Sequence, residues 1–136
     1  MAFAETAQDR RVLSGACPVT ITLSEDCKAG DCLGISSGTW VVSAHTSAEE
    51  PVLVAGTAGI SGQKITAYPV AIVECITTSS NVGTLGEVVA LSDTGTYKNA
   101  ASNQPDVGYV ASVGSDSLTA ILVVYPGVVN VDTPRT

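Results

Sequence analysis

The residues best suited to chemistry lie in the stretch GDCLGISSGTW, Gly30 to Trp40. Within it, GISSG matches the Gly-x-Ser-x-Gly pattern of a hydrolase nucleophile elbow, which would make Ser36 the nucleophile and His45 its base. An elbow of this kind needs a helix directly after the serine. Here TWVVSA follows, and such a β-branched run favours a strand. We therefore predict that Ser36 is a turn residue and that the protein is not an enzyme.

The four cysteines are the next candidates for chemistry. Cys27 and Cys32 are separated by four residues, but a zinc site wants four ligands, usually in tight pairs, and His45 is the single histidine. Cys32 and Cys75 alternate with apolar neighbours, as buried strand residues do. We predict free and mostly buried thiols, no metal and no cofactor. Disulfides become the better expectation if the protein works outside the cell.

Composition and charge exclude some partners. The chain of 136 residues is 45% hydrophobic and 14% charged, which indicates one globular domain. Six basic residues face thirteen acidic ones, for a net charge of −7, so the basic footprint of a nucleic-acid-binding protein is missing. The N-terminus lacks the pattern of a signal peptide, and no apolar run is long enough for a membrane helix. We expect a soluble protein, made in the cytoplasm, that binds neither nucleic acid nor membrane.

The hydrophobic pattern predicts an all-β fold, a small barrel or sandwich of short strands. Runs rich in Val, Ile and Thr are separated by glycine-bearing turns, and no segment has a convincing helical stripe. The longest run, QKITAYPVAIVECITT, is expected to be two strands or one strand broken near Pro69. The predicted strands lie in residues 17–23, 31–36, 39–45, 52–56, 63–78, 86–92, 96–98, 106–113 and 118–125.

An internal repeat supports this fold. GDCLGISSGTW and GEVVALSDTGTY (Gly86–Tyr97) share a glycine, an acidic residue, aliphatic residues, a serine, a turn glycine, a threonine and an aromatic residue. Glycine supplies the positive φ that hairpin turns require. We predict two related hairpins, Gly30–Trp40 and Gly86–Tyr97.

The two ends of the chain lack this pattern. Residues 1–16 have no clean periodicity, and we interpret them as an extended, loosely attached N-terminal arm, with a short helix possible over residues 4–11. The predicted organisation is an arm (1–16), a β domain (17–127) and a C-terminal tail (128–136).

The order of three motifs resembles a known family. AGDCLGISSG (29–38), LGEVVALSDTG (85–95) and DVGYVASVGSDSLTAILVVYPG (106–127) are similar to segments of the head-decoration, or capsid-cementing, proteins of tailed bacteriophages. The resemblance covers residues 17–127. It implies a protein without a catalytic site that binds the major capsid protein on the outer surface of an expanded head, usually as a homotrimer. The four cysteines depart from what we associate with that family.

The arm is the expected attachment segment. Phe3 could anchor in a groove of the shell, and Arg10 and Arg11 could pair with capsid carboxylates. A disordered terminus is the alternative. A different class of function is a ligand- or carbohydrate-binding β-module of a surface assembly. Sugar sites favour exposed aromatic side chains, and the chain has few aromatic residues.

Overall fold

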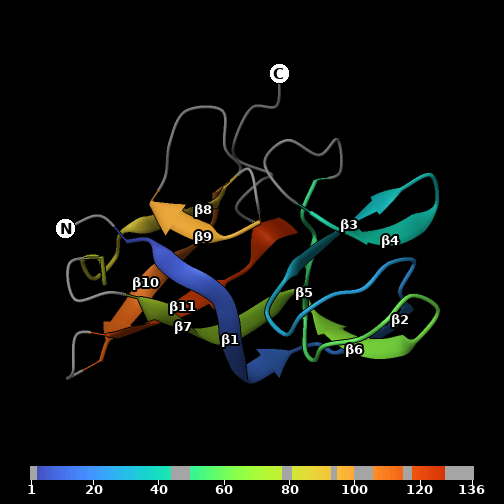
Figure 1. The fold of residues 1–136 in the computed structure, drawn as a ribbon, viewed down its shortest axis with the longest axis horizontal. Coiled ribbons are helices and arrows are strands. Elements are labelled where there is room, and N and C mark those ends of the chain that lie inside the picture. The colour runs from blue at the N-terminus through green and yellow to red at the C-terminus, as the bar shows by residue number, and fades with distance from the viewer. Residues whose placement is uncertain are drawn as a thin grey trace.

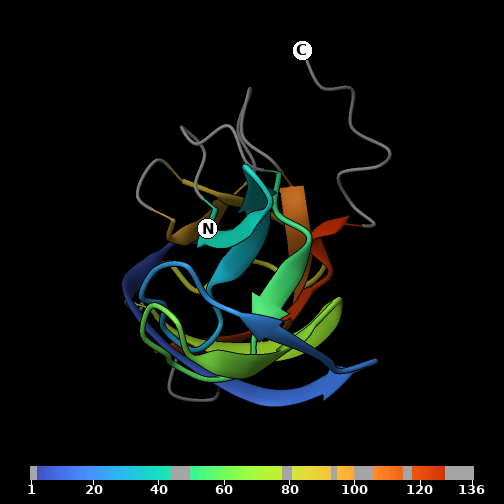
Figure 2. The same ribbon diagram turned by 90° about the vertical axis from the view of Figure 1, so that its right-hand side faces the viewer.

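Two antiparallel sheets make up the protein (Figures 1 and 2). The computed structural model describes residues 3–43, 50–77, 81–92, 95–99, 106–114 and 118–127, except the side chains of residues 6–8. The six-stranded sheet has the order β1 (Glu5–Ala16), β7 (Val70–Thr77), β11 (Thr119–Val124), β10 (Asp106–Val113), β8 (Val88–Leu91) and β9 (Tyr97–Asn99). The five-stranded sheet has the order β2 (Val19–Thr22), β6 (Lys64–Tyr68), β5 (Leu53–Ala55), β3 (Cys32–Ser36) and β4 (Thr39–Val42). The predicted all-β fold is confirmed, as a small sandwich whose sheets are not closed into barrels.

A bent two-stranded ribbon joins the sheets. β1 pairs with β7 in the first sheet, and their continuations β2 and β6 pair in the second. The bend lies at Cys17, whose φ is +57°, and Pro18 on one strand and at Pro69 on the other, so the predicted break near Pro69 is confirmed. Next to the bend, Gly15 leaves room for the Tyr68 ring, because a Cβ atom there would lie 2.3 Å from that ring.

The N-terminal segment belongs to the sheet, which corrects the prediction of a loosely attached arm or a short helix. β1 pairs with β7 from Glu5 opposite Thr77 to Ala16 opposite Val70. Two register shifts, between residues 5 and 10 and between residues 12 and 14, interrupt the alternation of inward and outward side chains. These irregularities explain why the sequence shows no period there. The predicted tail, residues 128–136, lies outside the described residues.

Two hydrophobic cores are separated by the central strands of the five-stranded sheet. Cys32 and Val54 point into the core shared with the six-stranded sheet. Their neighbours Leu33 and Leu53 point to the opposite face, into a second core formed by residues of the five-stranded sheet and its loops. Successive side chains of a strand point to opposite faces. β3 and β5 are therefore buried on both faces, which fixes the two sheets against each other.

The same four-residue turn leads into three of the strands. It is formed by Lys28–Asp31 before β3, Ile60–Gln63 before β6 and Thr84–Glu87 before β8. In each turn the third residue is a glycine with a φ between +83° and +88°, and the fourth N–H donates to the first carbonyl. The side chain of the fourth residue accepts a hydrogen bond from the N–H of the first, at 2.8–3.0 Å. The Gly-acidic element of the sequence repeat is thus a turn that starts a strand.

Candidate functional site

Ser36 lies at the end of a tight hairpin. It pairs with Thr39 across a turn in which Ser37 has a φ of +51° and Gly38 a φ of +80°. Positive φ at both central residues is typical of the two-residue hairpin turn that matches the twist of the strands. Strand β4 follows, so the strand–turn–helix geometry of a nucleophile elbow is absent at this position. The hairpin prediction is confirmed here and for β8 and β9, in which Val89 lies opposite Asn99 and Leu91 opposite Tyr97. The proposed base, His45, lies outside the described residues.

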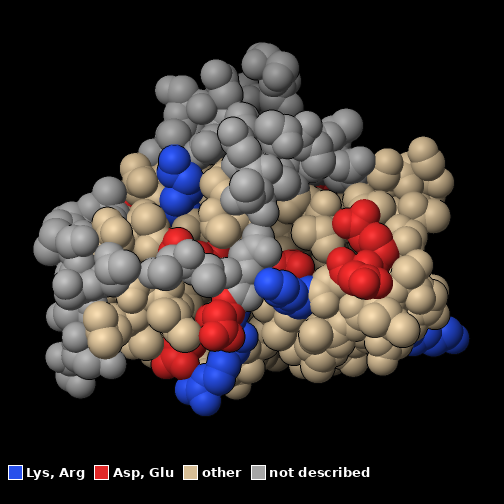
Figure 3. Space-filling view, viewed as in Figure 1, with Lys and Arg blue, Asp and Glu red and all other residues tan. Residues whose placement is uncertain are grey.

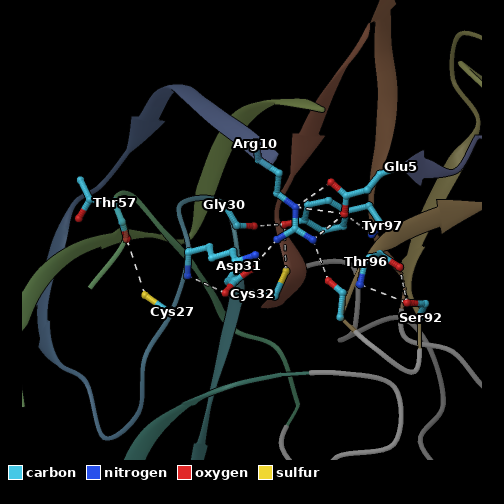
Figure 4. Close-up of polar contacts among 12 residues, drawn as sticks. Glu5, Arg10, Cys27, Gly30, Asp31, Cys32, Thr57, Ser92, Thr96 and Tyr97 are labelled. Carbon is cyan, nitrogen blue, oxygen red and sulfur yellow. Dashed lines mark hydrogen bonds and ion pairs between the residues drawn. The ribbon is translucent and has the colours of Figure 1, made fainter. Parts of the chain in front are cut away.

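Arg10 lies at the centre of a buried charged cluster (Figure 4). Its guanidinium donates to the Glu5 carboxylate at 2.6–3.1 Å, to Asp31 Oδ1 at 2.6 Å and to the Gly95 carbonyl at 2.8 Å. It also lies 4.2 Å from the centre of the Tyr97 ring. The Arg10 and Glu5 side chains are fully buried. The cluster links β1 and β9 of one sheet to the turn before β3 of the other.

Protonation follows from this burial. Burial alone would lower the pKa of Arg10, but Tyr97, Glu5 and Asp31 outweigh it and raise the pKa above its usual value. Burial raises the pKa of Tyr97, whose hydroxyl donates to the Gly30 carbonyl. The guanidinium is therefore charged and the phenol neutral, both engaged in internal hydrogen bonds. The cluster is suited to holding the sheets together.

The cysteines are free thiols, as predicted. Cys17 is exposed at the bend of the ribbon, and the other three are buried. Burial raises the pKa of Cys27 to about 11 and that of Cys32 to about 12, and it raises the pKa of Cys75 well above its ordinary value. The thiolate is the reactive form of cysteine, so the three buried thiols are unreactive at neutral pH.

The three predicted attachment residues lie in different environments. Phe3 is fully buried, and its N–H donates to Glu87 Oε2 at 2.9 Å. Arg10 faces inward, whereas the side chain of Arg11 is 73% exposed and pairs with Glu74 at 2.7 Å. Phe3 and Arg10 can contact a partner only if they leave the interior, so the structure corrects the expectation that they project from an arm. Arg11 remains accessible.

An open groove lies beside the five-stranded sheet. It has a volume of about 660 Å³ and is lined by the turns around residues 25–31 and 58–63 and by Val42. Figure 3 shows one cluster of acidic side chains on this half of the molecule and further acidic side chains on the other half. Two of the lining carboxylates already bind the backbone: Glu25 accepts from the Val42 N–H and Asp26 from the Ser61 N–H. They hold the loops of the groove in place.

Apolar side chains gather on the outer face of the six-stranded sheet. We call the apolar residues on this face the outer patch. They are exposed or half-buried, and along their strands they alternate with core residues. The outer patch consists of Ile72, Ile76, Val88, Tyr109, Ile121, Val123 and Tyr125. The register places four of them in one row across β8, β10, β11 and β7, because Tyr109 lies opposite both Val88 and Val123, and Val123 lies opposite Ile72. The Tyr109 and Tyr125 rings meet edge to face, 6.0 Å apart. Sequence reasoning missed this surface.

Comparisons with known proteins add no family. No family model matches the chain, and no curated protein is significantly similar to it. Within the described ranges, no group of three or more His, Cys, Asp or Glu side chains could hold a metal ion. Nor does that part of the chain contain a helix long and apolar enough to span a membrane.

Proposed function

We propose that the protein is a non-enzymatic structural protein that binds the major capsid protein on the outer surface of a tailed-phage head and stabilises the expanded head. It is made in the host cytoplasm and acts as a homotrimer. The resemblance of residues 17–127 to head-decoration proteins supports the partner and the location. The two similar motifs at residues 29–38 and 85–95 each contain a strand-starting turn followed by the first strand of a hairpin.

The outer patch is the observation that supports a role in assembly. Isolated apolar residues are normal on protein surfaces, whereas the largest contiguous apolar patch of a protein, typically about 300–600 Å², is often functional. Four adjacent strands present such an area here. The buried charged cluster around Arg10 lies between the two sheets and stabilises the fold. Assembly is therefore the activity that the accessible surface favours.

Binding to purified heads tests the proposal. The protein is titrated onto expanded empty heads and onto unexpanded precursor heads of the phage that encodes it, and bound protein is measured after sedimentation. We expect saturable binding to the expanded heads and greater resistance of the decorated heads to heat. Absence of binding to either form would refute the proposal.

The groove favours the ligand-binding module as a second candidate. Carboxylate and amide side chains such as Glu25 and Gln63 line it, and such groups hydrogen-bond sugar hydroxyls. Among the described residues that line it there is no aromatic side chain, which a sugar site would favour. A glycan array probed with the labelled protein separates the two functions, because a decoration protein should bind no glycan specifically.

A further inference from the structure

We infer that the outer patch is the surface through which copies of this chain bind one another, before and independently of any capsid. This inference deepens the proposed function by naming the surface that joins the copies. It rests on the proposed function only for the number of copies, three. Its basis is the register that aligns the patch, the charge balance around it and its area.

The charge distribution favours the outer patch over other parts of the surface as the contact between two copies. The chain carries a net charge of −7, so two copies repel each other over most of their area. One acidic residue, Glu74, lies between Ile72 and Ile76 on this face, and its ion pair with Arg11 is neutral overall. Like charges facing each other would be costly in an interface. The face with the smallest repulsion is thus the apolar one.

The ion pair also makes the face self-complementary. Arg11 lies directly opposite Glu74 on neighbouring strands, and Glu74 lies opposite Ile121 of the patch. In a closed ring all interfaces are identical, so the exposed guanidinium of each copy can face the carboxylate of the next. A second copy therefore offers both an apolar surface for the patch and a partner for each charge at its border.

The area predicts association of moderate strength. Four strands spaced about 4.8 Å apart, over four residues at about 3.4 Å each, give a patch of roughly 260 Å² before its edges are counted. A stable interface buries about 800 Å² on each partner. The patch can supply the apolar centre of such an interface, with the rest contributed by its border. Association should therefore depend on concentration.

Sedimentation velocity of the purified full-length chain over a range of concentrations tests this without capsids. We expect a reversible equilibrium between monomer and oligomer. Val88→Lys and Ile76→Lys, each at a side chain 43% exposed, should weaken the association constant at least about tenfold. Ile60→Lys and Leu85→Lys are matched controls, since these residues are 65% and 66% exposed outside the patch and should leave association unchanged. Melting temperatures confirm that all four variants are folded.

Charge reversal gives a second, independent readout. Arg11→Glu and Glu74→Arg should each weaken self-association, and an equimolar mixture of the two variants should associate more strongly than either alone. An ion pair that forms only within one chain cannot produce that rescue.

Three results would overturn the inference: a monomer at every soluble concentration, an assembly unaffected by both patch variants, or equal effects of patch and control variants. Failure of the proposed function would look different. An assembly that is sensitive to the patch but does not bind heads would leave this inference standing and remove the decoration role. A monomer that still decorates heads would do the reverse.

Discussion

Replacing Arg10 with methionine tests the role of the buried cluster. Arg10→Met keeps much of the side-chain length but removes the charge, which leaves the Glu5 and Asp31 carboxylates without their guanidinium partner in the interior. Breaking a buried ion pair in this way costs about 3–5 kcal/mol of stability. Unfolding entropy of about 2.1 cal/mol/K per residue means that each kcal/mol lowers the melting temperature of a chain of 136 residues by about 3.5 °C. The expected loss is therefore about 10–17 °C.

The neighbouring arginine provides the control. Arg11→Met removes an exposed pair worth up to about 1 kcal/mol, so the melting temperature should fall by less than about 4 °C. Differential scanning calorimetry and urea unfolding of both variants measure the contrast. Adding Glu5→Gln to Arg10→Met should recover part of the loss, because it removes one unpaired carboxylate. Equal, small effects of the two arginine substitutions would refute the assignment of Arg10 as an internal link between the sheets.

Further substitutions and labelling test other parts of the structure. Gly38→Val should cost about 1–3 kcal/mol through backbone strain alone, since φ is +80° but no atom lies near the added Cβ; an effect of zero in urea unfolding would contradict the turn assignment. Gly108→Ala should cost more, because its Cβ would lie 2.0 Å from the Val123 carbonyl oxygen; if calorimetry shows Gly108→Ala melting no lower than Gly38→Val, the strand pairing there is wrong. A thiol reagent at pH 8 should modify one cysteine per native chain, Cys17, and four after unfolding. The raised thiol pKa values also predict that stability is full below about pH 8.5 and falls as the pH rises above it, since the unfolded chain then releases protons that the folded chain retains. A urea midpoint that is higher at pH 10 than at pH 7.5 would contradict this sign.

Most strands could be predicted because their sequences alternate or form short apolar runs bounded by glycine. The hairpins were found from the repeat, and the structure shows why it recurs: Asp31 and Glu87 each accept the N–H of the first turn residue. Gln63 accepts the Ile60 N–H in the same way before β6. This third turn was missed because its fourth residue is a glutamine and not an acidic residue.

β1 could not be predicted from periodicity. Its two register shifts break the alternation, and its inward side chains include Glu5 and Arg10, which look like surface residues in a sequence. A buried charge is acceptable only with partners, and those partners, Asp31 and the Gly95 carbonyl, are distant in the chain. Local sequence carries no sign of such long-range pairing.

The outer patch left a signal that could have been used. VAIVECIT and TAILVV are apolar at almost every position, although an antiparallel strand with one face in water should alternate. Apart from Glu74, the outward positions of these two strands are mostly apolar, which indicates that the second face is also covered. The described part of the chain does not cover that face at Ile76, Val88 or Tyr109.

An electron cryomicroscopy reconstruction of expanded heads with and without added protein tests the central proposal most directly. We expect additional density on the outer surface, at regular positions over the major capsid protein, in which three copies of the two-sheet fold contact one another through their outer patches. Identical maps with and without a saturating excess of the protein would contradict it.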